Sequence, residues 1–313
     1  SQDFDSGRNR FTAHRRRRLK EIRYFIEYCL VRLILFLFDA LPYRFACMIG
    51  IGAGTIYWWI DRKRQKVAVA NILKSGVETD PKKARVIAKK AVHSMAILLV
   101  ESLRSNEFLE GDKMYDHLTF DIQPDVMAAL EDPDKGLIIA SGHFGNWEVA
   151  GHYISRFKPV AGITRKMNNP RVEKLVKQRK SRYRFRPIPK HDSNTARFLE
   201  ILDEKEILAL LFDQHAGSYG LMVPFFGHPA VTFKTVAMLH LVTRTPLCFA
   251  SCKRVGPMKF ELKSSNLIQV KRSGNKEEDL RNILTQLNRD LENVICEDPT
   301  QYLWAHRRWR DDD

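Results

Sequence analysis

The sequence predicts an α/β fold: a mainly parallel, twisted sheet with helices on both faces. Short apolar runs of β type alternate with helical stretches between residues 135 and 254, and such alternation is typical of parallel sheets, whose crossovers cover both faces. Of the 313 residues, 44% are hydrophobic, which is enough for a substantial core. The beginning of the chain differs, because two basic runs flank a long apolar region there. We therefore expect a membrane-associated helical region at 1–75 and an α/β domain at 76–313.

The apolar region at 24–60 is not predicted to span a membrane. Charged residues interrupt its first half, so that no window of about 20 residues is free of charge. Basic runs flank it at 14–23 and 61–66, and each Lys or Arg near an anionic lipid surface contributes about 1 kcal/mol of attraction. We expect one or two interfacial helices, with the aromatic residues 57–59 at the level of the lipid headgroups. A buried helical hairpin of a soluble protein is the alternative.

The elements of the second region follow from their apolar patterns. The chain should be helical up to about residue 110, because an Asp-Pro start signal precedes apolar residues at helical spacing. Candidate strands are 135–142, 158–165, 206–214 and 245–254, with an edge strand at 259–264. Helices are expected near 146–157, 168–182, 193–204, 231–243 and 277–299.

Composition limits the partners and the compartment. Lys and Arg number 52 against 37 Asp and Glu, a formal net charge of +15, so the protein should attract anionic lipid, nucleic acid or an acidic protein. A nucleic-acid-binding function would explain the charge and little else. No zinc-finger or RNP-type motif is present to support it. The five cysteines lack C-x-x-C spacing, which is typical of free thiols in a reducing compartment. We therefore expect the α/β domain in a cytoplasm.

Polar residues follow three of the predicted strands. His143 follows the first strand, and Glu148 lies five positions later. Arg165 ends the second strand, and the third ends at Asp213 and Gln214. Because the carboxyl ends of parallel strands meet at one edge of a sheet, these side chains should converge on one crevice.

The residue types around His143 indicate acid–base chemistry. His143 is the candidate general base, since its pKa lies near neutral pH, and Glu148 is the candidate that orients the imidazole. The N–H groups of Gly145 and Asn146, with the arginine that ends the second strand, are candidates to hold an oxyanion. Gly142 and Gly145 should let the backbone approach the reacting carbon. The segment lacks the G-x-S-x-G pattern of a nucleophile elbow. This absence favours direct attack by a substrate hydroxyl, without a covalent enzyme intermediate.

Other roles were weighed for these side chains. A metal site built from His143, Glu148, Asp213 and His215 is not expected, because H-x4-E is not the H-E-x-x-H spacing of metalloproteases. Asp213 could equally cap a helix or pair with an arginine. The basic run at 177–186 could be an ordinary solvated helix face.

Four motifs occur in a fixed order along the chain. They are HFGNWE at 143–148, ITRKMNNPRVEKLV at 163–176, FDQHAGSYGLMVPFFGHPAVT at 212–232 and QYLWAHRRWR at 301–310. This set resembles the late acyltransferases of lipid A biosynthesis, the lauroyl and myristoyl enzymes of Gram-negative bacteria. The resemblance covers most of the chain.

This resemblance implies a fold like that of the glycerol-phosphate acyltransferases and a place at the cytoplasmic face of a bacterial inner membrane. It implies transfer of a fatty acyl chain from acyl carrier protein to a hydroxyl of a lipid A precursor, the secondary acylation. No cofactor and no metal are implied, since phosphopantetheine arrives on the acyl carrier protein. The alternatives are an acyltransferase for another glycolipid and an acyl-thioester hydrolase.

The resemblance also assigns residues. The family's His-x4-acid motif maps onto His143 and Glu148, and the residues Arg165, Asp213 and Gln214 belong to the same site. This chain departs from the family at His215, where other members often carry an acid, so that a second carboxylate there is in doubt.

The implied partners fit the charge of the chain. Acyl carrier protein is acidic, so a basic surface would steer it, and an anionic membrane surface is a second partner. The lipid acceptor carries phosphates, for which Arg165, Lys166 and Arg171 are candidate headgroup ligands. The basic run at 177–186 could join them or be an ordinary solvated helix face. No nucleic-acid partner is expected.

Overall fold

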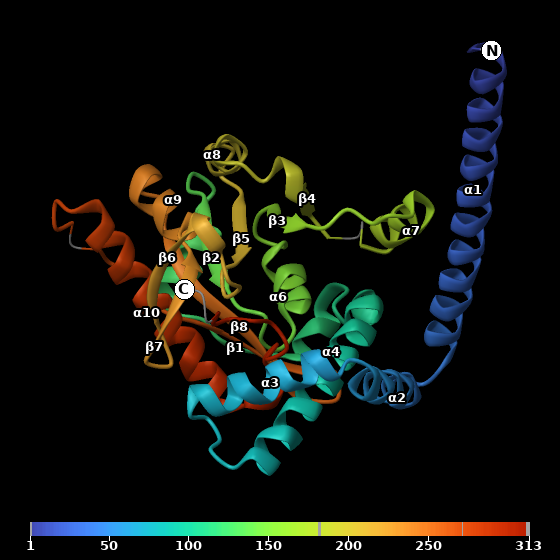
Figure 1. Ribbon diagram of the computed structural model, residues 1–313. Helices are drawn as coiled ribbons and strands as arrows, with labels where there is room; N and C mark the ends of the chain where they lie inside the picture. Colours follow the sequence, from blue (N-terminus) through green and yellow to red (C-terminus); the bar gives the residue numbers. More distant parts are fainter. Residues whose placement is uncertain (1, 181–182, 271, 311–313) are drawn as a thin grey trace.

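A seven-stranded sheet forms the centre of the structure (Figure 1). This computed structural model describes the chain except residues 1, 181–182, 271 and 311–313, and its description of side chains also omits 2–16, 106 and 179–180. Across the sheet lie β1 (Leu118–Asp121), β9 (Lys259–Ser264), β8 (Leu247–Gly256), β2 (Leu137–Ser141), β5 (Ile207–Leu211), β3 (Val160–Thr164) and β4 (Phe185–Pro189). Neighbouring strands are parallel except β8 and β9. The predicted mainly parallel sheet is therefore confirmed.

The helices form an N-terminal group before β1 and a second group between and after the strands. The first group is α1 (Gln2–Ala40), α2 (Tyr43–Ile60), α3 (Arg62–Ser75) and α4 (Pro81–Phe108). The second is α5 (Pro124–Glu131), α6 (Trp147–Ile154), α7 (Pro170–Lys180), α8 (Thr195–Asp203), α9 (Thr235–Thr243) and α10 (Lys276–Glu297). Short 3₁₀-helices are η1 (Gly111–Asp116), η2 (Lys190–Asp192), η3 (Gly217–Tyr219) and η4 (Pro299–Gln301).

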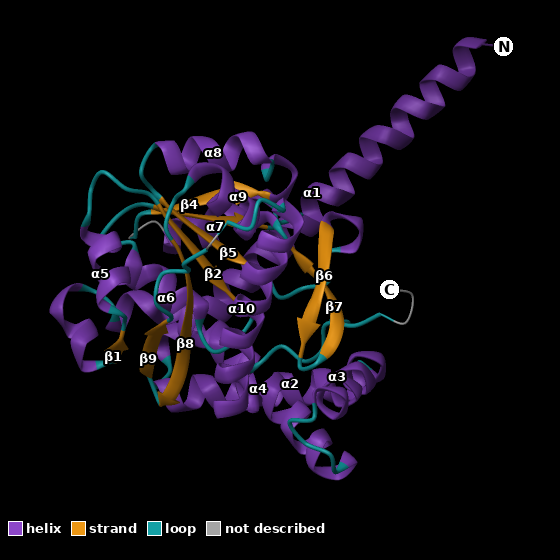
Figure 2. Cartoon of the chain, turned by 90° about the vertical axis from the view of Figure 1, so that its left-hand side faces the viewer, coloured by secondary structure: helices purple, strands orange, loops and turns teal. Residues whose placement is uncertain are grey.

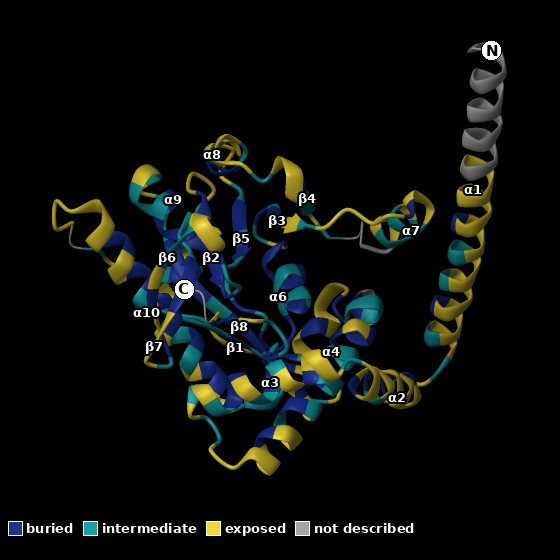
Figure 3. Ribbon diagram, in the orientation of Figure 1, coloured by how far each residue is buried: buried dark blue, intermediate teal, exposed yellow. Residues whose placement is uncertain are grey.

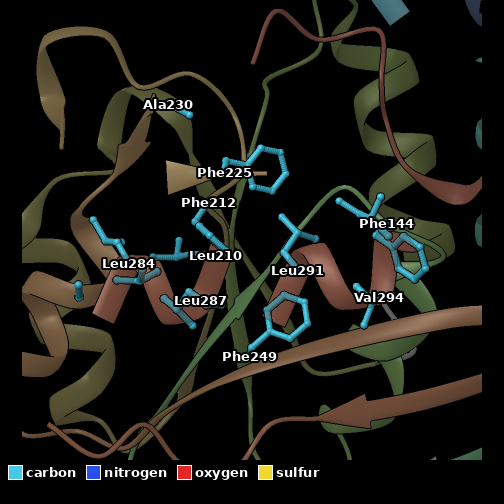
Figure 4. Close-up of a cluster of buried hydrophobic side chains, with 14 of the residues drawn as sticks. Phe144, Leu210, Phe212, Phe225, Ala230, Phe249, Leu284, Leu287, Leu291 and Val294 are labelled. Carbon is cyan, nitrogen blue, oxygen red and sulfur yellow. The ribbon is translucent and has the colours of Figure 1, made fainter. Parts of the chain in front are cut away.

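Strand β2 is buried on both sides, which explains its continuous apolar run. Ile138 and Ala140 belong to a core shared with α8, α9 and α10, part of which Figure 4 shows around Leu284, Leu287 and Leu291. The alternate residues of β2 face a second core shared with α5 and α6. Successive side chains of a strand point to opposite faces, so helices cover both sides of the sheet, as predicted (Figure 2).

Both edges of the sheet differ from the prediction. The segment 259–264 is not an edge strand, because β1 pairs with β9 on its outer side. Strand β4 lies at the opposite edge, in a segment whose alternating prolines hide its β character, and an edge strand tolerates them because its outer backbone needs no partner.

The predicted helix at 231–243 begins later than expected. It starts at Thr235, because β6 (Gly220–Phe225) and β7 (His228–Phe233) form an antiparallel hairpin. The turn residues Phe226 and Gly227 both have positive φ, 50° and 73°, which suits the twist of a two-residue hairpin.

Helices α1 and α2 extend the structure away from the sheet (Figure 1). Figure 3 shows exposed residues along both, and many of these are large and apolar, such as Phe36, Met48 and Ile60. Among the helices that the structure describes, none combines the length and apolar character needed to cross a bilayer. The predicted helices are confirmed, whereas their association with a membrane stays a prediction, as does the boundary at 75.

The prediction for the aromatic residues 57–59 is wrong for one of them. Tyr57 and Trp59 are exposed, but Trp58 is only 3% exposed and lies in the main core under the guanidinium of Arg85, 5.5 Å from its ring. Consecutive residues of a helix point about 100° apart, so three in a row cannot share one face.

Candidate active site

The carboxyl ends of β2, β5 and β3 lie side by side at one edge of the sheet. These three strands are parallel neighbours in the order β2, β5, β3. His143 follows β2, Asp213 and Gln214 follow β5, and Arg165 follows β3. The three strand ends of the sequence prediction therefore share one edge, and two of them are in direct contact.

His143 and Asp213 form the closest polar contact at this edge. The imidazole Nδ1 lies 2.8 Å from Asp213 Oδ1, and the backbone N–H of His143 donates to Oδ2 at 2.9 Å. The Asp213 side chain is 2% exposed and that of His143 is 18% exposed. One carboxylate thus holds both the ring and the backbone of His143, which fixes the direction in which the ring points.

The electrostatics of this pair favour an ionised carboxylate. Burial alone would raise the pKa of Asp213, but the charge of His143, two hydrogen bonds from it and the charge of Arg308 outweigh burial and lower the pKa. Burial alone would lower the pKa of His143, but the charge of Asp213 and the hydrogen bond to it raise the pKa. An ionised carboxylate only accepts hydrogen bonds, so Nδ1 carries the proton and neutral His143 keeps a lone pair on Nε2.

The Nε2 atom of His143 lies on the ring across from the bond to Asp213. Gln214 Nε2 lies 3.4 Å from it, a long contact. The Trp147 ring meets the imidazole edge-on, with ring centres 5.2 Å apart. Nε2 is thus the atom of His143 that can accept a proton from a substrate.

Glu148 is not the residue that holds Nδ1. It lies in the first turn of α6, and a side-chain hydrogen bond joins it to Tyr183, whose pKa is raised by burial and by this carboxylate. The orienting bond expected from Glu148 is made by Asp213 instead. A strand-to-helix turn separates His143 from Glu148, whereas β2 and β5 are neighbouring strands, which brings His143 to Asp213.

Gly145 and Asn146 are held by the protein itself. The N–H of Gly145 donates to Gln301 O at 3.0 Å, and that of Asn146 donates to Cys252 O at 2.7 Å. The expected oxyanion role of these two N–H groups is therefore wrong for this arrangement, because both donors are already in use. Sequence could not reveal this, since both acceptors lie far along the chain.

The glycines of this turn serve close packing. Gly145 has a φ of +59°, and a Cβ there would lie 1.9 Å from Cys252 O. A Cβ at Gly142 would lie 2.6 Å from Leu291 Cδ1 on α10. The two glycines let the turn pack directly on β8 and α10. The prediction was that they would let the backbone approach a reacting carbon.

A buried carboxylate supports the same turn from the N-terminal helices. Glu101 on α4 is 0% exposed and accepts from Asn146 Nδ2 and from Tyr43 on α2, both at 2.9 Å. Arg254 on β8 donates to both of its oxygens at 2.7 Å. Asn146 in turn caps α6 by accepting from Val149 N–H. Sequence reasoning missed this group, because its members come from four separate elements.

The basic candidates lie on the exposed side of the site. Arg165 and Lys166 are exposed in the segment after β3. Arg171 on α7 pairs with Glu21 on α1 at 3.5 Å and lies over the Phe25 ring at 5.7 Å. Helix α7 therefore contacts α1. The prediction for the basic run at 177–186 falls partly on residues 179–182, which lie outside the description of side chains.

Other chemical groups are few. Within the part of the chain that the structure describes, no three His, Cys, Asp or Glu side chains are grouped in a way that would hold a metal ion. His215 donates its backbone N–H to His306 Nε2 at 3.1 Å. The five cysteines are free thiols, as predicted.

Comparisons with known proteins cover nearly the whole chain. A family model described as bacterial lipid A biosynthesis acyltransferase matches residues 12–311. The chain is similar to the lipid A biosynthesis palmitoleoyltransferase of Escherichia coli (strain K12) and to the lipid A biosynthesis acyltransferase of Shigella flexneri. Each is 22% identical over 281 residues, which is 88% of this chain and 89% of the relative.

Proposed function

Because the chain belongs to the bacterial lipid A biosynthesis acyltransferase family, we propose that it carries a fatty acyl chain from acyl carrier protein to a hydroxyl group of a lipid A precursor. The observation that supports this most is the pair of His143 and Asp213 at the carboxyl edge of the sheet, in which the bond at Nδ1 leaves Nε2 as the proton acceptor. The family establishes an acyltransferase in lipid A biosynthesis. The donor, the secondary position of the acyl chain and the mechanism are our proposal.

In the proposed reaction His143 acts as the general base. Its Nε2 takes the proton of the acceptor hydroxyl while the oxygen attacks the thioester carbonyl. The tetrahedral intermediate then expels the phosphopantetheine thiolate, which recovers that proton from the imidazolium. The new ester forms as the thioester breaks, and no acyl group is attached to the protein.

Asp213 is the proposed orienting group. It holds Nδ1–H and offsets the positive charge that develops on the ring, the task of the third group in a catalytic triad. Glu148 stays a candidate at the start of α6, where we propose that it supports the reaction without holding Nδ1. For the oxyanion, Arg165 and Gln214 remain the candidates at this edge of the sheet.

The exposed basic side chains suit the proposed partners. We propose that Lys166 and Arg171 bind phosphates of the acceptor, since Arg and Lys are the usual ligands of such groups. The net charge of +15 would attract acidic acyl carrier protein at long range. The exposed apolar residues of α1 and α2 would lie in the cytoplasmic leaflet of an inner membrane.

The test is product analysis. The purified protein is incubated with acyl carrier proteins of several chain lengths and with a panel of lipid A precursors, and the products are weighed by mass spectrometry. We expect a precursor heavier by one acyl group, formed by the wild type and not by His143→Ala. Free fatty acid as the sole product would favour a hydrolase, and acylation of another glycolipid alone would change the acceptor.

A further inference from the structure

The C-terminal strap, residues 299–309, lies against the turn that carries His143. Gly145 N–H donates to Gln301 O, and Leu303 N–H donates to His143 O, both at 3.0 Å. The strap therefore holds the backbone of this turn at two points.

The same strap also holds the segment that follows β5. Nε2 of His306 lies 3.1 Å from the backbone nitrogen of His215, and because an amide N–H only donates, the imidazole nitrogen accepts. His215 comes directly after Asp213 and Gln214. Both of these side chains contact His143. One short piece of chain thus contacts both strand ends that meet in the site.

The surroundings of His306 keep its ring neutral. Burial lowers the pKa of His306 to about 4, although the charge of Asp213 acts in the opposite direction. The charges of His143, Arg64 and Arg308 lower this pKa further. A neutral imidazole carries one proton, so with Nε2 as the acceptor the proton lies on Nδ1. The acceptor is therefore in place at neutral pH, where a histidine base works.

Helix α3 also holds the strap. Asn71, which is 8% exposed, donates from Nδ2 to Trp304 O at 2.8 Å and to His306 O at 2.6 Å. Arg64 donates to Ala305 O at 2.9 Å. These bonds engage three consecutive carbonyls, so the backbone at His306 has a fixed position relative to α3.

Packing alone does not explain a histidine at this position. Trp304 and Trp309 belong to the main core, and they account for the attachment of the strap by packing. The imidazole of His306 is only partly buried. What it adds is a hydrogen-bond acceptor for the backbone of the segment after β5.

We propose that His306 is a positioning residue of the acyl-transfer reaction, which holds the strand end that carries Asp213 against the turn of His143. The inference rests on the proposed function of His143 as general base. Two backbone bonds tie the strap to the turn, and one imidazole bond ties it to the strand end, so the strap sets the distance between the two. Catalytic groups work within about 0.5 Å of their productive geometry, so the loss of one tie should disturb the bond between Asp213 and Nδ1.

The test compares His306→Leu with His306→Gln in the whole chain. Leucine removes the acceptor, whereas glutamine places an amide oxygen near the former position of Nε2. We expect kcat for acyl transfer by His306→Leu to fall by about five- to tenfold with KM nearly unchanged, since a hydrogen bond that keeps the reacting groups in place is lost. His306→Gln should keep at least about half of the wild-type kcat. Circular dichroism at the assay temperature gives the folded fraction, so that rates are compared per folded molecule.

A second readout does not depend on turnover. It is the nitrogen NMR spectrum of the His143 ring in protein isotopically labelled at histidine. A displaced strand end changes the hydrogen bond from Nδ1 to Asp213, so these resonances should move in His306→Leu and stay near their wild-type values in His306→Gln.

The matched control is His117→Leu. His117 is also partly buried, and it donates from Nδ1 to Met258 O at 2.8 Å, beside β1 at the outer edge of the sheet. This variant should lower stability but leave kcat and the His143 resonances unchanged. A purely structural role of His306 would give the same result as this control.

The outcomes separate the two proposals. A folded His306→Leu protein with the kcat and the His143 resonances of the wild type would overturn the role of His306. If this variant does not fold, the wild type decides: a His306 ring that carries its proton on Nε2 cannot accept from His215 N–H and would overturn the role, whereas a proton on Nδ1 would support it. A wild type that transfers no acyl chain would instead overturn the proposed function, while the nitrogen spectra would still report on His306.

Discussion

Two ion pairs, one that supports the turn of His143 and one that joins α7 to α1, differ in how far they are buried. On the buried side Arg254 holds Glu101 through two bonds of 2.7 Å, with side chains 12% and 0% exposed. On the outer side Arg171 reaches Glu21 at 3.5 Å, with side chains 49% and 57% exposed. A solvated pair contributes roughly 0 to 1 kcal/mol, whereas a buried pair is costly to break. The comparison teaches that the turn of His143 is fixed firmly by a buried ion pair, whereas α7 is held to α1 by a pair that solvent weakens.

The largest expected effect is that of His143→Ala. Removing a general base costs about 10²–10⁴-fold in rate, and the ring, 18% exposed, adds little to packing. We expect kcat/KM for acyl transfer to fall by that factor, while thermal denaturation checks that the variant still folds. Hydroxylamine should trap no acyl-enzyme from the wild type. An active His143→Ala protein, or an acyl adduct on a side chain, would overturn the mechanism.

The next effect distinguishes the two carboxylates near His143. Asp213→Asn removes the charge that raises the pKa of His143, so burial then lowers the pKa and the acid limb of kcat/KM should move to lower pH. The rate at the optimum should fall by roughly 10²-fold or more, because the imidazole loses its orienting charge. Glu148→Gln should lower the rate less and leave the acid limb in place.

One outcome would contradict the assignment of Asp213 as the partner of His143. If Glu148→Gln moves the acid limb and Asp213→Asn does not, then Glu148 is the partner of His143 during turnover, and the arrangement changes when substrate binds. The two variants are isosteric with the wild type, so a measured difference reports on charge.

A third prediction compares the two ion pairs directly. Arg254→Met leaves the carboxylate of Glu101 buried without its cation, so the free energy of unfolding should fall by about 3–5 kcal/mol. The matched variant Arg171→Met should change it by less than about 1 kcal/mol. Denaturant titration measures both. Equal losses from the two variants would mean that the buried and outer pairs do not differ as the structure indicates.

The remaining prediction concerns the membrane surface and leaves the fold unchanged. Reversing the charges of Arg15 to Arg18 should weaken binding to anionic vesicles, since each basic residue near the surface contributes about 1 kcal/mol, and the loss should shrink as salt rises. The side chains of Arg15 and Arg16 lie outside the described residues, so the argument rests on their charge. Vesicle sedimentation at two salt concentrations is the measurement. Unchanged binding would remove the basic run from the membrane contact.

The sequence predicted the parts of the fold that depend on local pattern. Buried strands such as β2 and β5 are apolar on both sides, and α10 carries a capping residue and an apolar stripe, so each is recognised within its own segment. Strand β4 and the hairpin of β6 and β7 were missed, because prolines there reduce the β signal and only their neighbours reveal their pairing.

The site was predictable only as a set of strand ends. His143 and Asp213 stand out because each follows an apolar run, but their contact depends on β2 and β5 being neighbours. Glu148 is closer to His143 in the sequence and was therefore predicted as its partner. Asp213 is the actual partner, because β5 lies beside β2 in the sheet. His306 and Glu101 could not be assigned, since each reaches the site from an element far away along the chain.

The position of residues 299–309 also fixes when the turn of His143 is completed during synthesis. The turn leaves the ribosome before β8, β9 and α10, and its backbone partners Gln301 and Leu303 follow all of them. Domains generally fold as units, so a growing chain can form α1 and α2 long before His143 and Gly145 gain these two backbone bonds. Until Gln301 and Leu303 emerge, the turn lacks both of them.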